Sequence, residues 1–165
     1  MPDDALGTQL RHLLDAMDAD VASACADVGL RDYRPRYSPV VRALLARGPC
    51  SIRDLATAIG VTHSAASQTA AQMYRRGLVS FTSGEDARER IVALTAEGRA
   101  LLPAIQAEWT ATRAAVRTLD AELPCRLHDL VAALQEALDR RPLRARIADA
   151  AADLDPPYRD RLARR

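Results

Sequence analysis

The sequence predicts a mainly α-helical fold that carries one small β-hairpin. Alanine is abundant and only 7 of the 165 residues are glycine, a composition that favours helices because alanine loses no side-chain entropy on entering one. Apolar residues recur at three- and four-residue steps along most of the chain, which is the helical period. Residues 78–94 differ, because two short runs of strand composition flank the polar segment 83–86 and indicate a hairpin.

The first predicted helix lies within residues 1–30 and ends near Gly29, the position of a C-terminal glycine. One face of this helix is acidic and the other is apolar, the apolar face consisting of Leu6, Leu10, Leu13, Leu14, Met17, Val21, Cys25 and Val28. A later helix carries a similar stripe from Leu127 to Leu138. Together these two helices carry more apolar surface than a small domain can bury. We therefore expect them to form a dimer interface.

Two short helices are predicted next. Ser38 and Pro39 suit the N-cap and the first helical position of a helix that would bury Val40, Val41, Leu44 and Leu45. Ser51 begins the following helix, with Asp54 three residues later as in a capping box. The inward face of this second helix is predicted to be Ile52, Leu55, Ala56 and Ile59.

A third helix is predicted over residues 63–76, after a tight turn at residues 60–62. Thr62 suits its N-cap, and Gly77 ends it. Val61 and Met73 are expected to anchor this helix to the core. Small residues would let it cross the preceding helix closely, namely Ala56, Gly60, Ala65 and Ala66.

Beyond the hairpin, Thr95 is predicted to cap a helix that runs to Leu119, with at most a mild kink where Pro103 lies in its first turns. Another helix is expected over residues 124–140, followed by a short helical pattern. The predicted organisation is therefore an N-terminal dimerisation helix (1–30), a winged helix-turn-helix domain (38–95), C-terminal helices that complete the dimer interface (96–141) and a C-terminal extension (142–165).

The helix over residues 63–76 carries the predicted DNA-reading surface. Two helices joined by a tight turn and followed directly by a hairpin form a winged helix-turn-helix, whose second helix enters the major groove. Residues 62–72 include no acid, although a polar helix face exposed only to solvent usually carries Glu and Lys. Hydroxyls and a helix N-terminus suit phosphate, amides suit adenine, and arginine suits guanine. The predicted contacts are Thr62, His63, Ser64, Ser67, Gln68, Gln72 and Arg75.

Charge is distributed unevenly along the chain. Residues 1–30 hold six acids and one arginine, whereas residues 31–100 hold eleven arginines and six acids, within a formal net charge of +1. Every basic residue is arginine, which suits bidentate recognition of phosphate and bases but equally fits the codon usage of a GC-rich genome. In the hairpin, Arg88 and Arg90 are predicted to contact the DNA backbone as a wing. Because acids lie beside them, a solvated turn is the alternative.

The run from Ser51 to Ile105 resembles the core of the MarR family of bacterial transcriptional regulators. The spacing from Gly60 to Gly77 matches the recognition segment of that family without a gap, and the similarity extends over residues 5–140. Further matches are the Arg-Gly-Leu-Val exit at residues 76–79, an Asp-x-Arg in the wing (Asp86, Arg88) and a Leu-Thr-x-x-Gly helix start (Leu94, Thr95, Gly98). The sequence departs from the pattern at Gln68, where the family often has arginine, and at Glu89, where it often has a second aspartate.

The resemblance implies a homodimer that sets two recognition helices about one DNA turn (~34–36 Å) apart on a pseudo-palindromic operator. It implies a repressor, released by a small aromatic or phenolic acid or by an oxidant. Candidates for an acid site are Tyr33, Arg36, Tyr37 and Trp109, although the aromatic side chains would serve equally well in packing. Cys125, beside an arginine near a helix start, is the candidate redox sensor, whereas Cys25 and Cys50 are expected in the core.

Other classes of protein find little support in the sequence. It has no glycine-rich phosphate loop, metal-ligand cluster or Ser-His-Asp arrangement, so we expect neither an enzyme nor a cofactor. The sequence has three cysteines without close spacing and no signal peptide, which indicates a cytoplasmic protein. No apolar run approaches the ~20 residues of a membrane span, so we expect no contact with a membrane. The predicted function is a sequence-specific regulator that binds double-stranded DNA. The alternative is a winged-helix architectural or protein-interaction module, whose DNA affinity would be indifferent to sequence.

Overall fold

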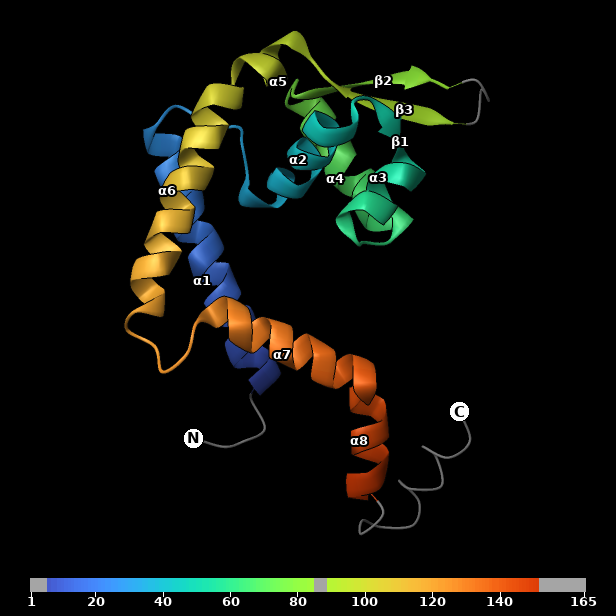
Figure 1. Cartoon of the computed structure of the whole chain (residues 1–165). Coiled ribbons are helices and arrows are strands. Elements are labelled where there is room, and N and C mark those ends of the chain that lie inside the picture. Colours follow the sequence, from blue (N-terminus) through green and yellow to red (C-terminus); the bar gives the residue numbers. More distant parts are fainter. Residues whose placement is uncertain (1–5, 85–88, 152–165) are drawn as a thin grey trace. The chain divides into compact units, whose positions relative to one another are not determined.

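The computed structural model describes residues 6–84 and 89–151. The chain divides into two compact units, Met1–Thr112 and Arg113–Arg165. Figure 1 shows the helices and strands in chain order: α1 (Leu6–Asp27), the short 3-10 helix η2 (Pro35–Tyr37), α2 (Ser38–Arg47), β1 (Cys50–Ser51), α3 (Ile52–Ile59), α4 (His63–Arg75), β2 (Val79–Ser83), β3 (Arg90–Leu94), α5 (Ala96–Ala100), α6 (Leu102–Asp120), α7 (Leu127–Arg140) and α8 (Leu143–Ala150). The mainly helical fold with a small hairpin is confirmed.

The hairpin belongs to a three-stranded antiparallel sheet in the order β1-β3-β2. In the hairpin itself, Val79 pairs with Leu94 and Ser83 pairs with Arg90. The third strand was not predicted from the sequence. It is the two-residue β1, in which Cys50 pairs with Val92. Since β1 leads directly into α3, this pairing joins the start of the helix-turn-helix to the hairpin that follows it.

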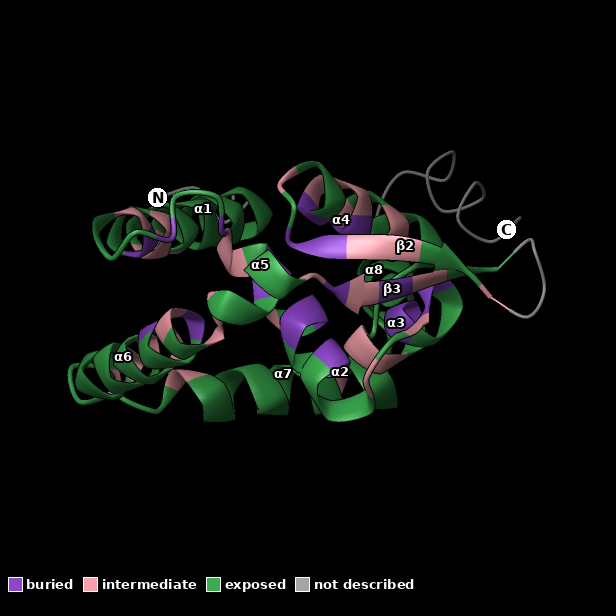
Figure 2. Cartoon of the chain, turned by 90° about the horizontal axis from the view of Figure 1, so that it is seen from above, coloured by how far each residue is buried: buried purple, intermediate pink, exposed green. Residues whose placement is uncertain are grey.

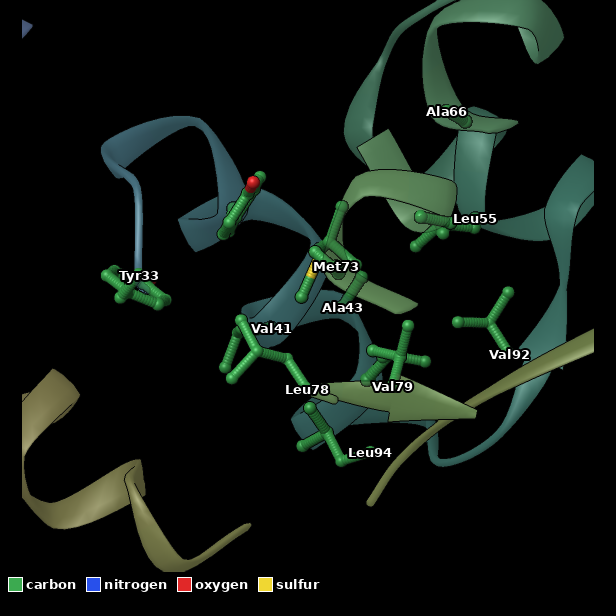
Figure 3. Packing of buried hydrophobic residues seen from close by; sticks show 14 of the residues in the cluster. Tyr33, Val41, Ala43, Leu55, Ala66, Met73, Leu78, Val79, Val92 and Leu94 are labelled. Atoms are coloured by element: carbon green, nitrogen blue, oxygen red, sulfur yellow. The ribbon is translucent and has the colours of Figure 1, made fainter. Parts of the chain in front are cut away.

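The core lies within the first unit, where the helix-turn-helix packs against the sheet. Buried residues gather on α2, α3, α4 and the strands, whereas α6 and α7 are mainly exposed (Figure 2). Figure 3 shows Met73 of α4, Leu55 of α3 and Val92 of β3 converging on this core. Of the small residues expected where α3 crosses α4, Ala56 and Ala66 are buried, whereas Gly60 is exposed. Val61 and Ala65 were expected inside as well, but both are exposed.

The N-caps of α3 and α4 form as the sequence predicts. The Ser51 hydroxyl accepts from the Asp54 amide (3.1 Å) and donates to the Asp54 carboxylate (2.8 Å). The Thr62 hydroxyl accepts from the Ala65 amide (3.2 Å). Between the two helices, Gly60 ends α3 with φ of 69°, a left-handed conformation that favours glycine because a Cβ would be strained there. These caps fix the two ends of the turn.

The prediction that Ser38 caps the N-terminus of α2 is wrong. The capping position is occupied by Tyr37, and no side chain caps the helix. A 3-10 turn, η2, precedes α2 and already directs the chain into it. The hydroxyl of Ser38 therefore lies inside the first turn and bonds side chains instead of a backbone amide. Leu45, expected on the buried face of α2, is 42% exposed.

The single helix predicted from Thr95 to Leu119 is also wrong, because it is two helices, α5 and α6, with a break at Leu101. Pro103 lacks an amide hydrogen, so the carbonyl four residues earlier cannot be satisfied by a continuing helix. The Thr95 cap is confirmed, since its hydroxyl accepts from the Gly98 amide (2.9 Å).

The second unit contains the end of α6 together with α7 and α8. Helix α7 begins at Leu127, three residues later than predicted, and none of its residues is buried. Arg141, which lies just before α8, forms an ion pair with Asp149 near the end of that helix. Among the described residues, no helix is long and apolar enough to cross a membrane.

Candidate nucleic-acid interface

The exposed face of α4 is the polar face that the sequence predicts. Ala66, Ala70 and Met73 are buried, and with 100° per residue they define one side of the helix. Ser64, Gln68 and Arg75 lie on the opposite side and are exposed. The remaining predicted contacts lie at the margins of this face or at its N-cap: Thr62, His63, Ser67 and Gln72.

A cavity of about 360 Å³ lies at the N-terminal end of α4, between this helix, the start of α3 and the sheet. His63 and Ser67 line it from α4, and Arg90 lines it from β3. The structure adds Arg53, on the first turn of α3, to the same cavity. Arg53 was not predicted from the sequence as a contact, although an exposed arginine on the first turn of the positioning helix could have indicated one. Two arginines and a helix N-terminus give this cavity the donors that bind phosphate, and Glu89 adds one carboxylate to its lining.

Arg90 is held in place by an aromatic stack. Its guanidinium carbon lies 3.9 Å from the centroid of the Phe81 ring across the hairpin. Phe81 in turn lies 5.3 Å from Tyr74 of α4, measured between ring centroids. A guanidinium on an aromatic face keeps its hydrogen-bond donors free at the ring edge. This stack therefore connects the loop end of the hairpin to the recognition helix. The other predicted wing residue, Arg88, lies outside the described residues, as does Asp86.

The C-terminal end of α4 borders a separate cavity of about 440 Å³. Gln72, Arg75 and Arg76 line it from the helix end, and Arg36 lines it from η2. The guanidinium of Arg76 donates to the Asp32 carbonyl (3.2 Å) and pairs with the Asp32 carboxylate (3.4 Å). Since His63 and Gln72 lie on opposite flanks of the helix, about 180° apart, the two cavities are on different sides of the reading face.

The hairpin is joined to α5 by a compact set of contacts. The Thr95 hydroxyl donates to the Gly77 carbonyl (2.5 Å), and the Thr95 amide donates to the Leu78 carbonyl (3.2 Å). Gly98 packs so closely that a Cβ placed on it would lie 2.2 Å from the Leu78 carbonyl oxygen. The end of α4, the base of the hairpin and the start of α5 are thereby held as one structure.

The four residues considered for an acid site are not brought together in one cavity. Tyr33 and Tyr37 are buried with their rings edge to face, 6.0 Å apart. The Tyr33 hydroxyl bonds Ser38 (2.8 Å), and Trp109 donates its indole hydrogen to the same Ser38 oxygen (3.0 Å). Arg36 and Tyr37 both line the cavity at the C-terminal end of α4, whereas Tyr33 and Trp109 do not. Burial raises the pKa of the Tyr33 hydroxyl, which keeps it protonated as a donor.

The cysteines lie in three different environments. Cys25 is fully buried and Cys50 is half-buried, and burial raises the pKa of both thiols. A raised pKa keeps the thiol protonated and slows its reaction with oxidants. Cys125 is exposed. Within residues 6–84 and 89–151, no group of three or more His, Cys, Asp or Glu side chains is placed to hold a metal ion.

Comparison with known proteins finds one family match and a set of similar folds. Residues 32–89 match the model of the MarR family, whereas no curated protein sequence matches the chain. The structure of the M. tuberculosis transcriptional regulator MosR in complex with DNA has a TM-score of 0.64 at 23% identity, over 84% of this chain and 98% of that one.

Two further solved structures are similar over comparable lengths. The S. aureus MepR–DNA complex has a TM-score of 0.62 at 18% identity, over 82% of this chain and 96% of MepR. Bordetella bronchiseptica BpsR, whose DNA binding is regulated by 6-hydroxynicotinic acid, has a TM-score of 0.62 at 20% identity, over 83% of this chain and 96% of BpsR. At these identities the likeness shows a shared winged-helix fold.

Proposed function

We propose that the chain, which belongs to the MarR family, is a sequence-specific DNA-binding transcriptional regulator in which α4 reads the major groove. The observation that carries this proposal is the outward face of α4, where Ser64, Gln68 and Arg75 are exposed with no carboxylate among residues 62–72. Amide and guanidinium groups on such a face match the donor and acceptor pattern of base edges.

The cavity at the N-terminal end of α4 extends this surface to the DNA backbone. With Gln68 in the groove, Arg53 and Arg90 would lie together on one side of the helix, where phosphates would pass. Arg90 is already fixed on Phe81, so binding to a phosphate would cost little side-chain entropy. The arginines would supply affinity for every sequence, and Gln68 would supply discrimination between sequences.

A homodimer is part of the proposal because the helices that flank the winged helix expose apolar faces. Leu6, Leu13 and Leu14 of α1 are 53–64% exposed. Leu130, Val131 and Leu134 of α7 are 52–55% exposed. Contiguous apolar surface of this kind marks an interface. Two copies joined through these helices would present two recognition helices to a pseudo-palindromic operator.

Control by a signal completes the proposal, in which the protein acts as a cytoplasmic repressor that a small molecule or an oxidant releases from its operator. The related BpsR structure, with DNA binding regulated by 6-hydroxynicotinic acid, supports a small-molecule signal. For an oxidant, Cys125 is the exposed thiol.

The test begins with selection of bound fragments from the genome that encodes the protein, followed by affinity measurement on the selected site and on a scrambled copy. Gln68→Ala and Arg75→Ala should each reduce affinity for the selected site by about 5- to 150-fold, since a good bidentate base contact is worth about 1–3 kcal/mol. Gln106→Ala on α6 and Arg99→Ala on α5, both at exposed positions, are the matched controls and should bind as the wild type does.

Sedimentation should show that both α4 variants remain dimers. Wild-type affinity in the two variants would contradict the assignment of α4 as the reading helix. Equal affinity of the wild type for the selected and scrambled sites would instead indicate an architectural module without an operator.

A further inference from the structure

A cavity of about 450 Å³ lies between α1 and α6, apart from the DNA-reading surface. Ala24 and Val28 line it from α1, and three alanines, Ala104, Ala107 and Ala111, line it from one face of α6. Alanine is too short to fill the space between two helices, so the cavity remains open along this face. Its volume lies in the range of pockets that hold small organic ligands, about 300–1,000 Å³.

One charged group faces this apolar cavity. Glu108 lies in the cavity wall and is only 8% exposed, which makes it the one charged side chain that is buried among the described residues. Its Oε1 accepts a hydrogen bond from the Thr112 hydroxyl (2.6 Å). Within the described part of the chain, no basic side chain forms an ion pair with it. A buried carboxylate without a cation is costly, so natural structures rarely keep one without a partner.

Two titratable groups, Cys25 and Tyr33, are influenced by the charge of Glu108. The raised pKa of each is due first to burial and also in part to that charge. Both groups are therefore neutral at physiological pH. Glu108 therefore lines a cavity whose other lining residues are alanines, one valine and Thr112, the residue that donates to its carboxylate.

We propose that this cavity binds an organic cation, with an ammonium or amidinium group paired to Glu108 and an apolar body against the alanines of α6. Charge-assisted hydrogen bonds to the carboxylate would orient the ligand, and removal of the apolar body from water would supply further affinity. An anion of the same shape would be repelled by Glu108. The binding itself is independent of DNA, and only its use as a regulatory signal rests on the proposed function.

The experiment uses the full chain without DNA and measures binding calorimetrically with benzamidine, an aromatic amidinium. Benzoate and benzyl alcohol have a similar shape but carry a negative charge and no charge, respectively. Glu108→Gln keeps the shape of the side chain and the acceptor for Thr112 while removing the charge. Glu97→Gln, at an exposed position on α5, is its matched control. Ala107→Leu fills the cavity, and Ala100→Leu at an exposed position on α5 is the control for that change.

Benzamidine should bind the wild type and both control variants. Glu108→Gln should weaken binding about tenfold or more, in keeping with hydrogen bonds to charged groups, and Ala107→Leu should weaken it as well. Benzoate should not bind.

Three results would overturn the proposal: equal binding of benzoate and benzamidine, unchanged affinity in Glu108→Gln, or no binding of benzamidine to the wild type. In the last case, a weaker dimer of Ala107→Leu in sedimentation would show that the cavity is occupied by a second copy of the chain. A separate measurement of operator affinity with and without benzamidine then tests the regulatory role, and its failure leaves the binding result intact.

Discussion

Gly98→Ala tests whether the junction of α4, the hairpin and α5 is as tight as the structure shows. Two effects oppose each other. Replacing glycine by alanine inside an exposed helix stabilises a protein by about 1 kcal/mol. At Gly98, however, the new Cβ would lie 2.2 Å from the Leu78 carbonyl oxygen, where contacts below 3.0 Å essentially do not occur. The backbone must therefore shift to accept the methyl group.

The cost of that shift follows from the bonds that it disturbs. The Leu78 carbonyl accepts from the Thr95 amide at 3.2 Å, and the Thr95 hydroxyl joins the Gly77 carbonyl to the Gly98 amide. Overpacking costs about 1–3 kcal/mol, and each weakened hydrogen bond adds about 1 kcal/mol. After the gain in helix propensity is subtracted, weakening of all three hydrogen bonds gives a net destabilisation of about 3–5 kcal/mol. For a chain of 165 residues this lowers the Tm by about 6–20 °C.

Thermal unfolding followed by circular dichroism measures the effect. The control is Gly7→Ala on α1, where the nearest neighbour of an added Cβ is the flexible end of Arg11 at 3.6 Å. This control should keep the wild-type Tm or raise it slightly. A Tm of Gly98→Ala at or above that of the wild type would refute the reasoning, because helix propensity would then outweigh the contact with Leu78. Below its Tm, the variant should also bind DNA more weakly, since the junction sets the wing.

Other changes probe single contacts. Ser38→Ala removes the oxygen to which Trp109 donates and should destabilise the fold by about 1–3 kcal/mol with a shift of Trp109 emission; unchanged emission would contradict the hydrogen bond. Arg53→Ala should reduce the slope of log affinity against log salt by about 0.9 for each phosphate that Arg53 neutralises without changing base preference, and a changed preference would mean that it reads bases. Burial raises the pKa of Cys25 above its ordinary value of 9.0. The folded state therefore holds this proton more tightly, and stability should be full below pH 9.0 and decline as pH rises from there towards the folded pKa. A thiol reagent should modify Cys125 in the folded protein well before Cys25; equal rates would contradict the burial of Cys25.

Local patterns in the sequence were sufficient for the elements around the reading helix. The caps at Ser51, Thr62 and Thr95 form as predicted, because each depends on a hydroxyl and an amide only three residues apart. The hairpin forms for the same reason, since its two strands are close in the chain. The acid-free face of α4 could also be identified, because the helical period alone separates Gln68 from the buried Met73.

The errors concern contacts between residues that are distant in the sequence. Serine is a residue type that often caps a helix N-terminus. The hydroxyl oxygen of Ser38 instead accepts a hydrogen bond from Trp109, 71 residues away. The strand β1 is only two residues long, so nothing but its pairing with β3 defines it. Arg53 became a candidate contact only when folding placed it in one cavity with His63 and Arg90.

The sequence by itself determined the helix-turn-helix, its hairpin and the polar face that would meet DNA, because local hydrogen bonds and a single helical period specify them. Only the tertiary structure decided which of these side chains share a site. It placed Arg36 beside the end of α4, buried Tyr33 and Tyr37 in the core, and placed Glu108 in the wall of an apolar cavity. The physical reason is that burial and charge pairing depend on what packs against a residue, and packing partners in this chain come from elements far apart in the sequence.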